Sequence, residues 1–376
     1  MKIVYLYPSL AITGGIERIL VDKMNWLSRH GDDVYIITSD QGMHRVPYLL
    51  DERVHFKDMN IRFHTQYRYS LPHRLWVRWR MFREYHVLLR QAFREIQPDV
   101  IVTATSQGIR SLLTLRGKTP LVVESHVNFS HPDTLLHRLQ NRVNHFWMSR
   151  AQAIVTLTEG DARDWRRISS RVHVIPNIVH LAPTPIPLPR GEGENASCRC
   201  IFVGRLVEQK GLPDLLAVWH LVHQRHPDWQ LHIYGEGDIS HLPLLPSYQE
   251  EGQGWGLLGV SIHPPVSNIF EKYQESAMLL LTSVYEPFGL VMPEAMSCGL
   301  PVVAFDCPHG PATIIHDGED GFLVSNRDRQ AFADRVCQLI EDPALRWRMG
   351  SNAVQSSRRF TPDAIMPRWQ NLFKSL

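Results

Sequence analysis

The sequence predicts an α/β protein of two domains, each built on a parallel sheet with helices around it. Three observations lead to this class. Short apolar runs of the buried-strand type alternate with helical spans in both halves of the chain. A proline-rich stretch separates the two halves. The chain has 376 residues, which is long for one hydrophobic core and sufficient for two.

Both halves show the order strand, loop, helix, strand. In the first half "KIVYLY" begins at Lys2, a helix with an apolar face ends near Gly31, and "VYIITS" (34–39) is the next strand. The later strands expected there are "DVIVTAT" (99–105), "PLVVESH" (120–126) and "AIVTLT" (153–158). The strands expected in the second half are "CIFVGRL" (200–206), "WQLHIYG" (229–235), "MLLLTS" (278–283) and "PVVAF" (301–305). Both halves are Rossmann-like, and ligands of such sheets bind at the carboxyl ends of the strands.

The boundary between the halves is unsuited to regular structure. Prolines at 183, 185, 187 and 189 exclude a helix or a central strand, so we expect an interdomain linker there. The last residues of the chain have the apolar spacing of a helix. The expected organisation is an N-terminal domain at 1–180, a linker at 181–198, a second domain at 199–360 and a C-terminal helix at 361–376, with the two domains facing each other across a cleft.

Composition and charge exclude several classes of protein. The formal net charge of +2 gives no basis for nucleic-acid binding. The sequence has no apolar run of about 18 residues, so a membrane-spanning helix is not expected. Cys198 and Cys200 are too close together for a zinc-knuckle pair. With five cysteines, an odd number, a reducing and therefore cytoplasmic location fits best.

The glycine loop "ITGGIER" (12–18) joins the first strand to the first helix. Gly14 and Gly15 allow the backbone to approach a ligand closely, and a helix N-terminus favours an anion. The G-x-G-x-x-G spacing of dinucleotide-binding loops is absent. A tight structural turn explains the two glycines equally well, so both interpretations stay open.

The stretch "VGRLVEQKGL" (203–212) is more specific. A strand ends at Gly204, and Arg205 and Lys210 follow near the start of the next helix. An arginine fork and a lysine point charge at a strand's carboxyl end suit a diphosphate. Either cation alone would be taken as surface charge, but their shared position favours a ligand. Gly235, in "YGEG", ends the next strand and adds a second loop that permits close approach.

Two carboxylates, Glu286 and Glu294, stand in the apolar stretch "YEPFGLVMPEAM". Charged groups are rarely left in such surroundings without a partner. Gly289 precedes a helix, so the free N–H groups of Leu290 and Val291 at its start can face a phosphate. Each glutamate can accept hydrogen bonds from ligand hydroxyls, one on either side. The alternative is that acids simply stabilise a helix N-terminus.

Together these motifs resemble those of the family 4 retaining glycosyltransferases, which have the GT-B fold. The spacing of the two glutamates is the family's E-x7-E element, and the cations of "GRLVEQKG" match its donor-phosphate pair. The glycine pair at 14–15 and "ESH" (124–126) match elements of its N-terminal domain. The resemblance runs over essentially the whole chain. A GT-B fold is therefore expected, with the C-terminal helix crossing back to the N-terminal domain.

The resemblance implies a role for each matching residue. Arg205 and Lys210 would bind the diphosphate of a nucleotide sugar and offset charge on the leaving group. Glu286 would contact the sugar hydroxyls, Glu294 the ribose hydroxyls, and His126 would lie beside the reacting sugar. The implied catalytic residues are Glu286, His126, Arg205 and Lys210. The implied donor-binding residues are Gly15, Gly204, Arg205, Lys210, Gly235, Glu286, Phe288, Gly289, Leu290, Val291 and Glu294.

The implied function is retaining transfer of a hexosyl or N-acetylhexosaminyl unit. The expected donor is a UDP-sugar, and the acceptor a glycan or lipid-linked glycan of bacterial surface polysaccharide or lipopolysaccharide. No Asp-x-Asp element is present, so no metal and no cofactor are expected. No side chain is an obvious covalent nucleophile, which favours front-face transfer. The alternatives are another GT-B sugar-nucleotide enzyme, such as an epimerase, and a non-catalytic nucleotide-sugar-binding protein.

Residues 62–94 carry eight arginines against one acid, Glu84, with aromatic residues between them. Leu75, Trp79 and Phe82 follow helical spacing. Basic residues beside tryptophan and phenylalanine suit anionic lipid headgroups, which predicts contact with the inner face of the cytoplasmic membrane. A core-packed helix with a solvated arginine face is the alternative.

Overall fold

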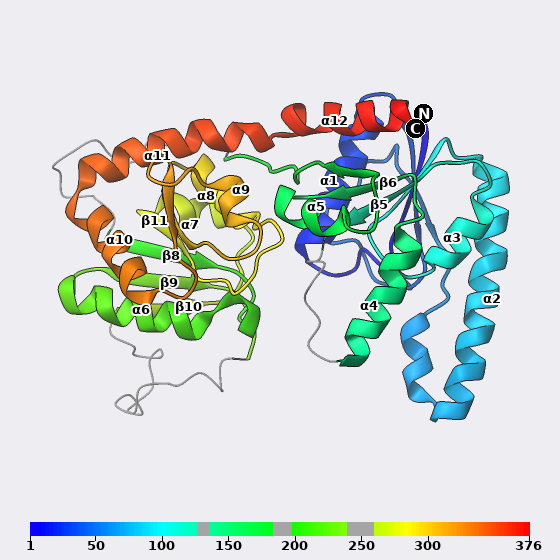
Figure 1. The fold of residues 1–376 in the computed structure, drawn as a ribbon, viewed down its shortest axis with the longest axis horizontal. Helices are drawn as coiled ribbons and strands as arrows, with labels where there is room; N and C mark the ends of the chain where they lie inside the picture. Colours follow the sequence, from blue (N-terminus) through cyan, green and yellow to red (C-terminus); the bar gives the residue numbers. More distant parts are fainter. Residues whose placement is uncertain (127–134, 183–197, 239–258) are drawn as a thin grey trace. The chain divides into compact units, whose positions relative to one another are not determined.

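The structure is a computed structural model that describes residues 1–126, 135–182, 198–238 and 259–376. It divides into two compact units, the first made of Met1–Ile178 with Ile365–Leu376 and the second of Val179–Ala364. Each unit has its own parallel sheet surrounded by helices (Figure 1). The prediction of two α/β domains is confirmed. Most of the expected linker lies outside the described residues.

The first unit is built on a sheet with the strand order β3-β2-β1-β4-β5-β6-β7. Every strand pair in it is parallel. The inner strands β4, β5 and β6 are buried at every residue, as expected where helices cover both faces of a sheet. The strands are β1 (Lys2–Leu6), β2 (Asp33–Thr38), β3 (His55–Asp58), β4 (Val100–Thr103), β5 (Leu121–Ser125), β6 (Ala153–Thr156) and β7 (Val172–Val174).

Helices of the first unit include the last one in the chain. α12 (Pro362–Ser375) buries Trp369 and Phe373, and the Lys23 ammonium of α1 lies 4.4 Å from the centre of the Trp369 ring. In Figure 1 α12, drawn in red, runs beside α1. The other helices are α1 (Gly15–Arg29), η1 (Phe63–Arg68), α2 (Leu71–Ile96), α3 (Ile109–Leu115), α4 (Leu135–Met148) and α5 (Glu159–Trp165).

The second unit is built on a parallel sheet with the strand order β10-β9-β8-β11-β12-β13. Its core joins apolar residues of these strands to α6 and α10, including Trp219, Phe305 and Phe332. The strands are β8 (Arg199–Val203), β9 (Gln230–Tyr234), β10 (Val260–His263), β11 (Met278–Leu281), β12 (Val302–Phe305) and β13 (Gly321–Val324). The helices are η2 (Glu208–Lys210), α6 (Leu212–Arg225), α7 (Ile269–Gln274), α8 (Val291–Ser297), α9 (Pro311–Ile314), α10 (Arg329–Glu341), α11 (Pro343–Ser357) and η3 (Arg358–Phe360).

The long helix α2 divides into two halves with different surroundings. Leu89 and Phe93, in its second half, are buried in the core of the first unit. Leu75 and Trp79, in its first half, are 67% and 58% exposed. Val77 and Met81 of the first half are also buried in this core, so the apolar face expected from the sequence is only partly covered there. Among the described residues, no helix is both long and apolar enough to cross a membrane.

Candidate active site

The strand order of the second unit gathers the predicted donor-site residues at one edge. β8 and β11 are neighbours in the sheet, so the loops that follow them meet at its carboxyl edge. The loop after β8 carries Arg205 and leads to Lys210 at the end of η2. The loop after β11 carries Glu286 and leads to α8. The site therefore forms because two distant segments share one edge.

Lys210 and Glu286 form an ion pair, with 2.5 Å between Lys210 Nζ and Glu286 Oε2. The side chains are only 12% and 8% exposed, so water screens this pair weakly. The Ser283 hydroxyl donates to the same Oε2 at 3.2 Å. Glu286 Oε1 has no partner among the described residues and is free to accept from a ligand hydroxyl. Lys210 likewise retains donors for a second acceptor, because an ammonium has three.

The backbone of Glu286 is held by the segment 308–310, which follows β12. Its N–H donates to the Pro308 carbonyl at 2.7 Å, and its own carbonyl accepts from Gly310 N–H at 2.7 Å. Gly289, three residues on, has a φ of +89°, and a Cβ there would lie 2.9 Å from Glu286 Cγ. Glycine is thus required at 289 by both conformation and space. These contacts give the carboxylate one fixed position.

Arg205 and the start of α8 have donors without a partner among the described residues. Arg205 is exposed, and no described side chain pairs with its guanidinium. No described residue accepts from the N–H groups of Leu290 and Val291, the cap and first residue of α8. Glu294, one turn into α8, is buried and accepts from the Tyr273 hydroxyl at 3.4 Å. The loop after β8 and the start of α8 therefore supply cationic and N–H donors at the sheet edge that also carries the two glutamates.

Other predicted donor residues pack against the protein itself. Phe288 is buried and lies edge-to-face with Phe360, so a ligand could meet only its backbone. A Cβ on Gly235 would come within 1.9 Å of the Gly204 carbonyl oxygen. The close approach that the sequence assigns to a ligand at Gly235 is thus also required by the neighbouring loop. Burial raises the pKa of the Cys307 thiol to about 12, which keeps this sulfur neutral below the Lys210–Glu286 pair.

The first unit places Gly15 and His126 at the carboxyl edge of its own sheet. Gly15 opens α1 after β1, and His126 directly follows β5. His126 Nε2 lies 2.9 Å from Glu124 Oε2, and Lys23 Nζ donates to the same oxygen. All three side chains are at most 3% exposed. If Glu124 is ionised, Nε2 of a neutral His126 must carry the proton, which leaves Nδ1 as an acceptor.

The structure adds residues that the sequence analysis missed. Lys23 is buried and joins His126 through Glu124, and Ser283 supports Glu286. The burial of Lys23 could have been predicted from the sequence, because Lys23 stands on the apolar face of its helix between Leu20 and Leu27. A lysine in that position needs a buried partner. Ser283 had no comparable signal, since a serine that ends a strand is common.

The fold defines a class of protein. The chain aligns over its whole length with the Anabaena protein HepE, solved with UDP and glucose, with a TM-score of 0.73, 20% identity and 100% coverage of both chains. It also aligns with TarM of S. aureus, with a TM-score of 0.77, 15% identity and 99% coverage of both chains. Likeness at this level of identity shows the fold alone, and the fold is GT-B.

Sequence comparison then identifies the family. The family described as Glycosyltransferase Family 4 matches residues 13–182, and that described as Glycosyl transferases group 1 matches residues 197–342. The chain belongs to these family 4, group 1 glycosyltransferases. The amylovoran biosynthesis glycosyltransferase AmsD of Erwinia amylovora is 28% identical over 99% of both chains. The poly(ribitol-phosphate) alpha-N-acetylglucosaminyltransferase of Staphylococcus aureus is 30% identical over 46% of this chain and 34% of its own length.

Proposed function

We propose that this glycosyltransferase moves a hexosyl or N-acetylhexosaminyl unit from a UDP-sugar, with retention of configuration, to a glycan or lipid-linked acceptor. The observation that carries the proposal is the Lys210–Glu286 ion pair, in a loop pair that also holds Arg205, whose guanidinium has no partner within the part of the chain that the structure describes. Relatives named for amylovoran and poly(ribitol-phosphate) glycosylation support surface polysaccharide or lipopolysaccharide assembly as the setting. A solved neighbour with UDP and glucose supports the donor class. The proposed location is the cytoplasm.

The proposed mechanism uses the chain's own charges. Arg205 and Lys210 bind the diphosphate and stabilise the negative charge that develops as the sugar leaves. Glu286, fixed by its backbone contacts, orients the sugar through the free Oε1. Glu294 accepts from the ribose hydroxyls, and His126 lies beside the reacting sugar.

Configuration is retained by front-face transfer in this proposal. The leaving phosphate oxygen takes the proton of the attacking acceptor hydroxyl, so no covalent intermediate forms on Glu286. Glu286 Oε2 already accepts from Lys210 Nζ and from the Ser283 hydroxyl, so in this proposal Oε1 is left to bind a sugar hydroxyl. Trapping a stable adduct on Glu286 would contradict this step. The transfer is proposed to need no metal, so turnover should be equal with and without a chelator.

A donor screen tests the proposal. Thermal unfolding is measured with UDP-, GDP- and ADP-sugars, because a ligand that binds only the native state raises its stability. We expect UDP-sugars to raise the Tm and to be turned over. Lys210→Met should lower turnover by about 100-fold or more, as the loss of a leaving-group donor does. The matched control is Lys272→Met, which removes another lysine paired with a glutamate in the same unit.

Three outcomes would contradict the proposal. Stabilisation by GDP- or ADP-sugars but not by UDP-sugars would contradict the donor. Binding of a UDP-sugar without turnover on any acceptor would favour a non-catalytic nucleotide-sugar-binding protein. Conversion of the sugar nucleotide without transfer would favour an epimerase-like enzyme.

We also propose that the first half of α2 docks on an anionic membrane surface. Trp76 and Trp79 are 55% and 58% exposed, and Leu71 and Leu75 are exposed beside them. The arginines of the same segment supply the positive charge that anionic headgroups attract. A solvated structural helix does not need four large apolar side chains in water.

Vesicle sedimentation tests this partner. Wild-type protein should pellet with phosphatidylglycerol vesicles at low salt and be released by high salt. The double variant Trp76→Ser/Trp79→Ser should stay in the supernatant. Leu49→Ser is the matched control, because Leu49 is 86% exposed and lies outside α2. Wild-type protein that never pellets, or a double variant that pellets equally, would contradict the proposal.

A further inference from the structure

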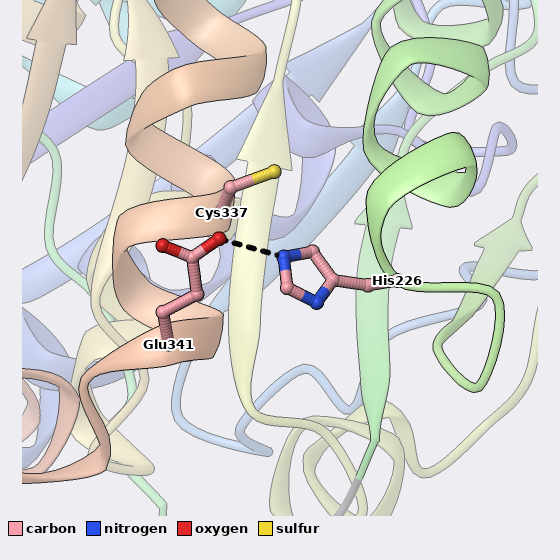
Figure 2. Close-up of side chains that lie close together, drawn as sticks. All are labelled: His226, Cys337 and Glu341. Carbon is pink, nitrogen blue, oxygen red and sulfur yellow. Dashed lines mark hydrogen bonds and ion pairs between the residues drawn. The ribbon is translucent and has the colours of Figure 1, made fainter.

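Three metal-ligand side chains converge where α6 and α10 end, in the second unit. His226 caps the C-terminus of α6, and Cys337 and Glu341 belong to the last turns of α10. Their ligand atoms all lie within 4.8 Å of one another. Figure 2 shows the imidazole and the carboxylate pointing toward each other with the thiol above them. Among the described residues this is the one such group.

The arrangement follows from the packing of the two helices. Cys337 and Glu341 are four residues apart and therefore share one face of α10. His226 Nε2 lies 3.0 Å from Glu341 Oε1 across the helix–helix contact. Cys337 is buried in the core of the second unit, while Glu341 is exposed. Two ligands thus come from one rigid helix and the third from the cap of its neighbour.

The simpler interpretation is an ion-pair clamp between the helices. The Arg225 guanidinium donates to Glu341 at 3.0 Å and to Asp334 at 2.9 Å. Arg225 is 44% exposed, so these pairs are screened by water and cost little to exchange. A clamp also does not require sulfur within reach of the imidazole and the carboxylate. Cysteine, histidine and glutamate together are the ligand types of Zn²⁺.

We propose that His226, Cys337 and Glu341 bind one borderline-soft divalent cation of the Zn²⁺ class. Arg225 moves into solvent, the Cys337 thiol gives its proton to water, and a water molecule completes a tetrahedral site. Nitrogen, sulfur and oxygen ligands favour Zn²⁺ over hard cations such as Mg²⁺ and Ca²⁺. The role is to hold the ends of α6 and α10 together.

The site is separate from the transfer chemistry. α6 begins after the carboxyl end of β8 and ends before the amino end of β9, and α10 likewise runs back from the end of β13. His226 and Glu341 therefore lie toward the amino edge of the sheet, opposite the edge that carries Lys210. A chelator should lower the Tm while leaving turnover at permissive temperature unchanged.

Cobalt titration of the full chain tests the proposal. After treatment with a chelator, the protein should bind about one equivalent of Co²⁺ and show a thiolate-to-cobalt charge-transfer band that Zn²⁺ abolishes. Cys337→Ser should remove the band. Because that change falls in the core, His226→Gln and Glu341→Gln are measured too. Each removes a ligand and should weaken binding by more than the roughly 10- to 100-fold that loss of an outer-shell partner costs.

Three further variants make the result decisive. Arg225→Ala should tighten binding by about fivefold, because it removes the competing cation. Glu275→Gln is the matched control for Glu341→Gln, since Glu275 is also an exposed glutamate paired with two cations. Cys198→Ser controls for the exposed thiol. Absence of the band in the wild type, wild-type affinity in both His226→Gln and Glu341→Gln, or loss of the band in Cys198→Ser would overturn the proposal.

Discussion

Replacing Lys23 by methionine should destabilise the first unit severely. Lys23 and Glu124 are each only 2% exposed and are paired with each other. Methionine keeps the length of the side chain and removes the charge, so packing against Trp369 is largely retained. Glu124 is then a buried carboxylate with the His126 hydrogen bond as its main support. Leaving one member of a buried pair without its partner costs about 3–5 kcal/mol.

The pKa of Glu124 predicts a stability loss of similar size and determines how that loss depends on pH. Burial by itself would raise the pKa of Glu124, but the Lys23 charge and the His126 hydrogen bond outweigh burial and lower it from 4.5 to about 2. This difference corresponds to about 3 kcal/mol of stability. Because the folded-state pKa is the lower one, that stability is present above pH 4.5 and is lost as the pH falls toward 2. The variant should therefore differ most from the wild type at neutral pH.

Urea unfolding at pH 7 and pH 4 measures the effect. We expect Lys23→Met to lower the free energy of unfolding by about 3 kcal/mol at pH 7 and by less at pH 4. Adding Glu124→Gln to Lys23→Met removes the second charge and should recover most of the loss. A loss below about 1 kcal/mol at pH 7, a loss that grows toward acid pH, or losses that simply add in the double variant would each refute the reasoning.

Two further substitutions test the packing, one in each unit. Gly235→Ala forces a Cβ to within 1.9 Å of the Gly204 carbonyl oxygen, so urea unfolding should show a loss of about 2 kcal/mol or more. Gly318→Ala, where a Cβ would meet nothing within 4 Å, should cost only the strain of its positive φ, and equal losses would contradict the packing argument. Trp369→Ala should lower the stability by about 3–5 kcal/mol, since this buried ring covers Lys23. Leu376→Ala, at the exposed end of the chain, should leave the stability nearly unchanged. If Trp369→Ala lowers the free energy of unfolding as little as Leu376→Ala does, α12 contributes little to stability.

The sequence determined most of the inner strands. β5, β6, β11 and β12 are buried at every residue, and a strand covered on both faces must be apolar throughout its length. The edge strands β3, β7, β10 and β13 were not predicted. β3, β7 and β10 have three or four residues, most of them exposed or half-buried, because each pairs on one side only. Without a buried apolar run, such segments do not differ from loops in sequence. β13 is mostly buried, but its apolar run of three residues after Gly321 is too short to indicate a strand.

The helix after Gly289 could also be predicted from the sequence. Glycine, proline and the apolar spacing place its start, and α8 begins at Val291 as expected. The sequence could not show in the same way that several apolar side chains in the first half of α2 are exposed. Leu75 and Leu89 follow one helical spacing, yet one is in water and the other in the core. Periodicity shows which face of a helix is apolar, but the length of the domain decides how much of that face is covered.

Only the tertiary structure decided which charges meet. Lys210 and Glu286 are 76 residues apart, and they pair because β8 and β11 are neighbours in the sheet. Lys23 and Glu124 are 101 residues apart and meet where α1 packs on the first sheet. A side chain's own type and spacing predict that it is buried and charged, and so that it needs a partner. The identity of that partner depends on strand order and helix packing, which the pattern of a single segment does not contain.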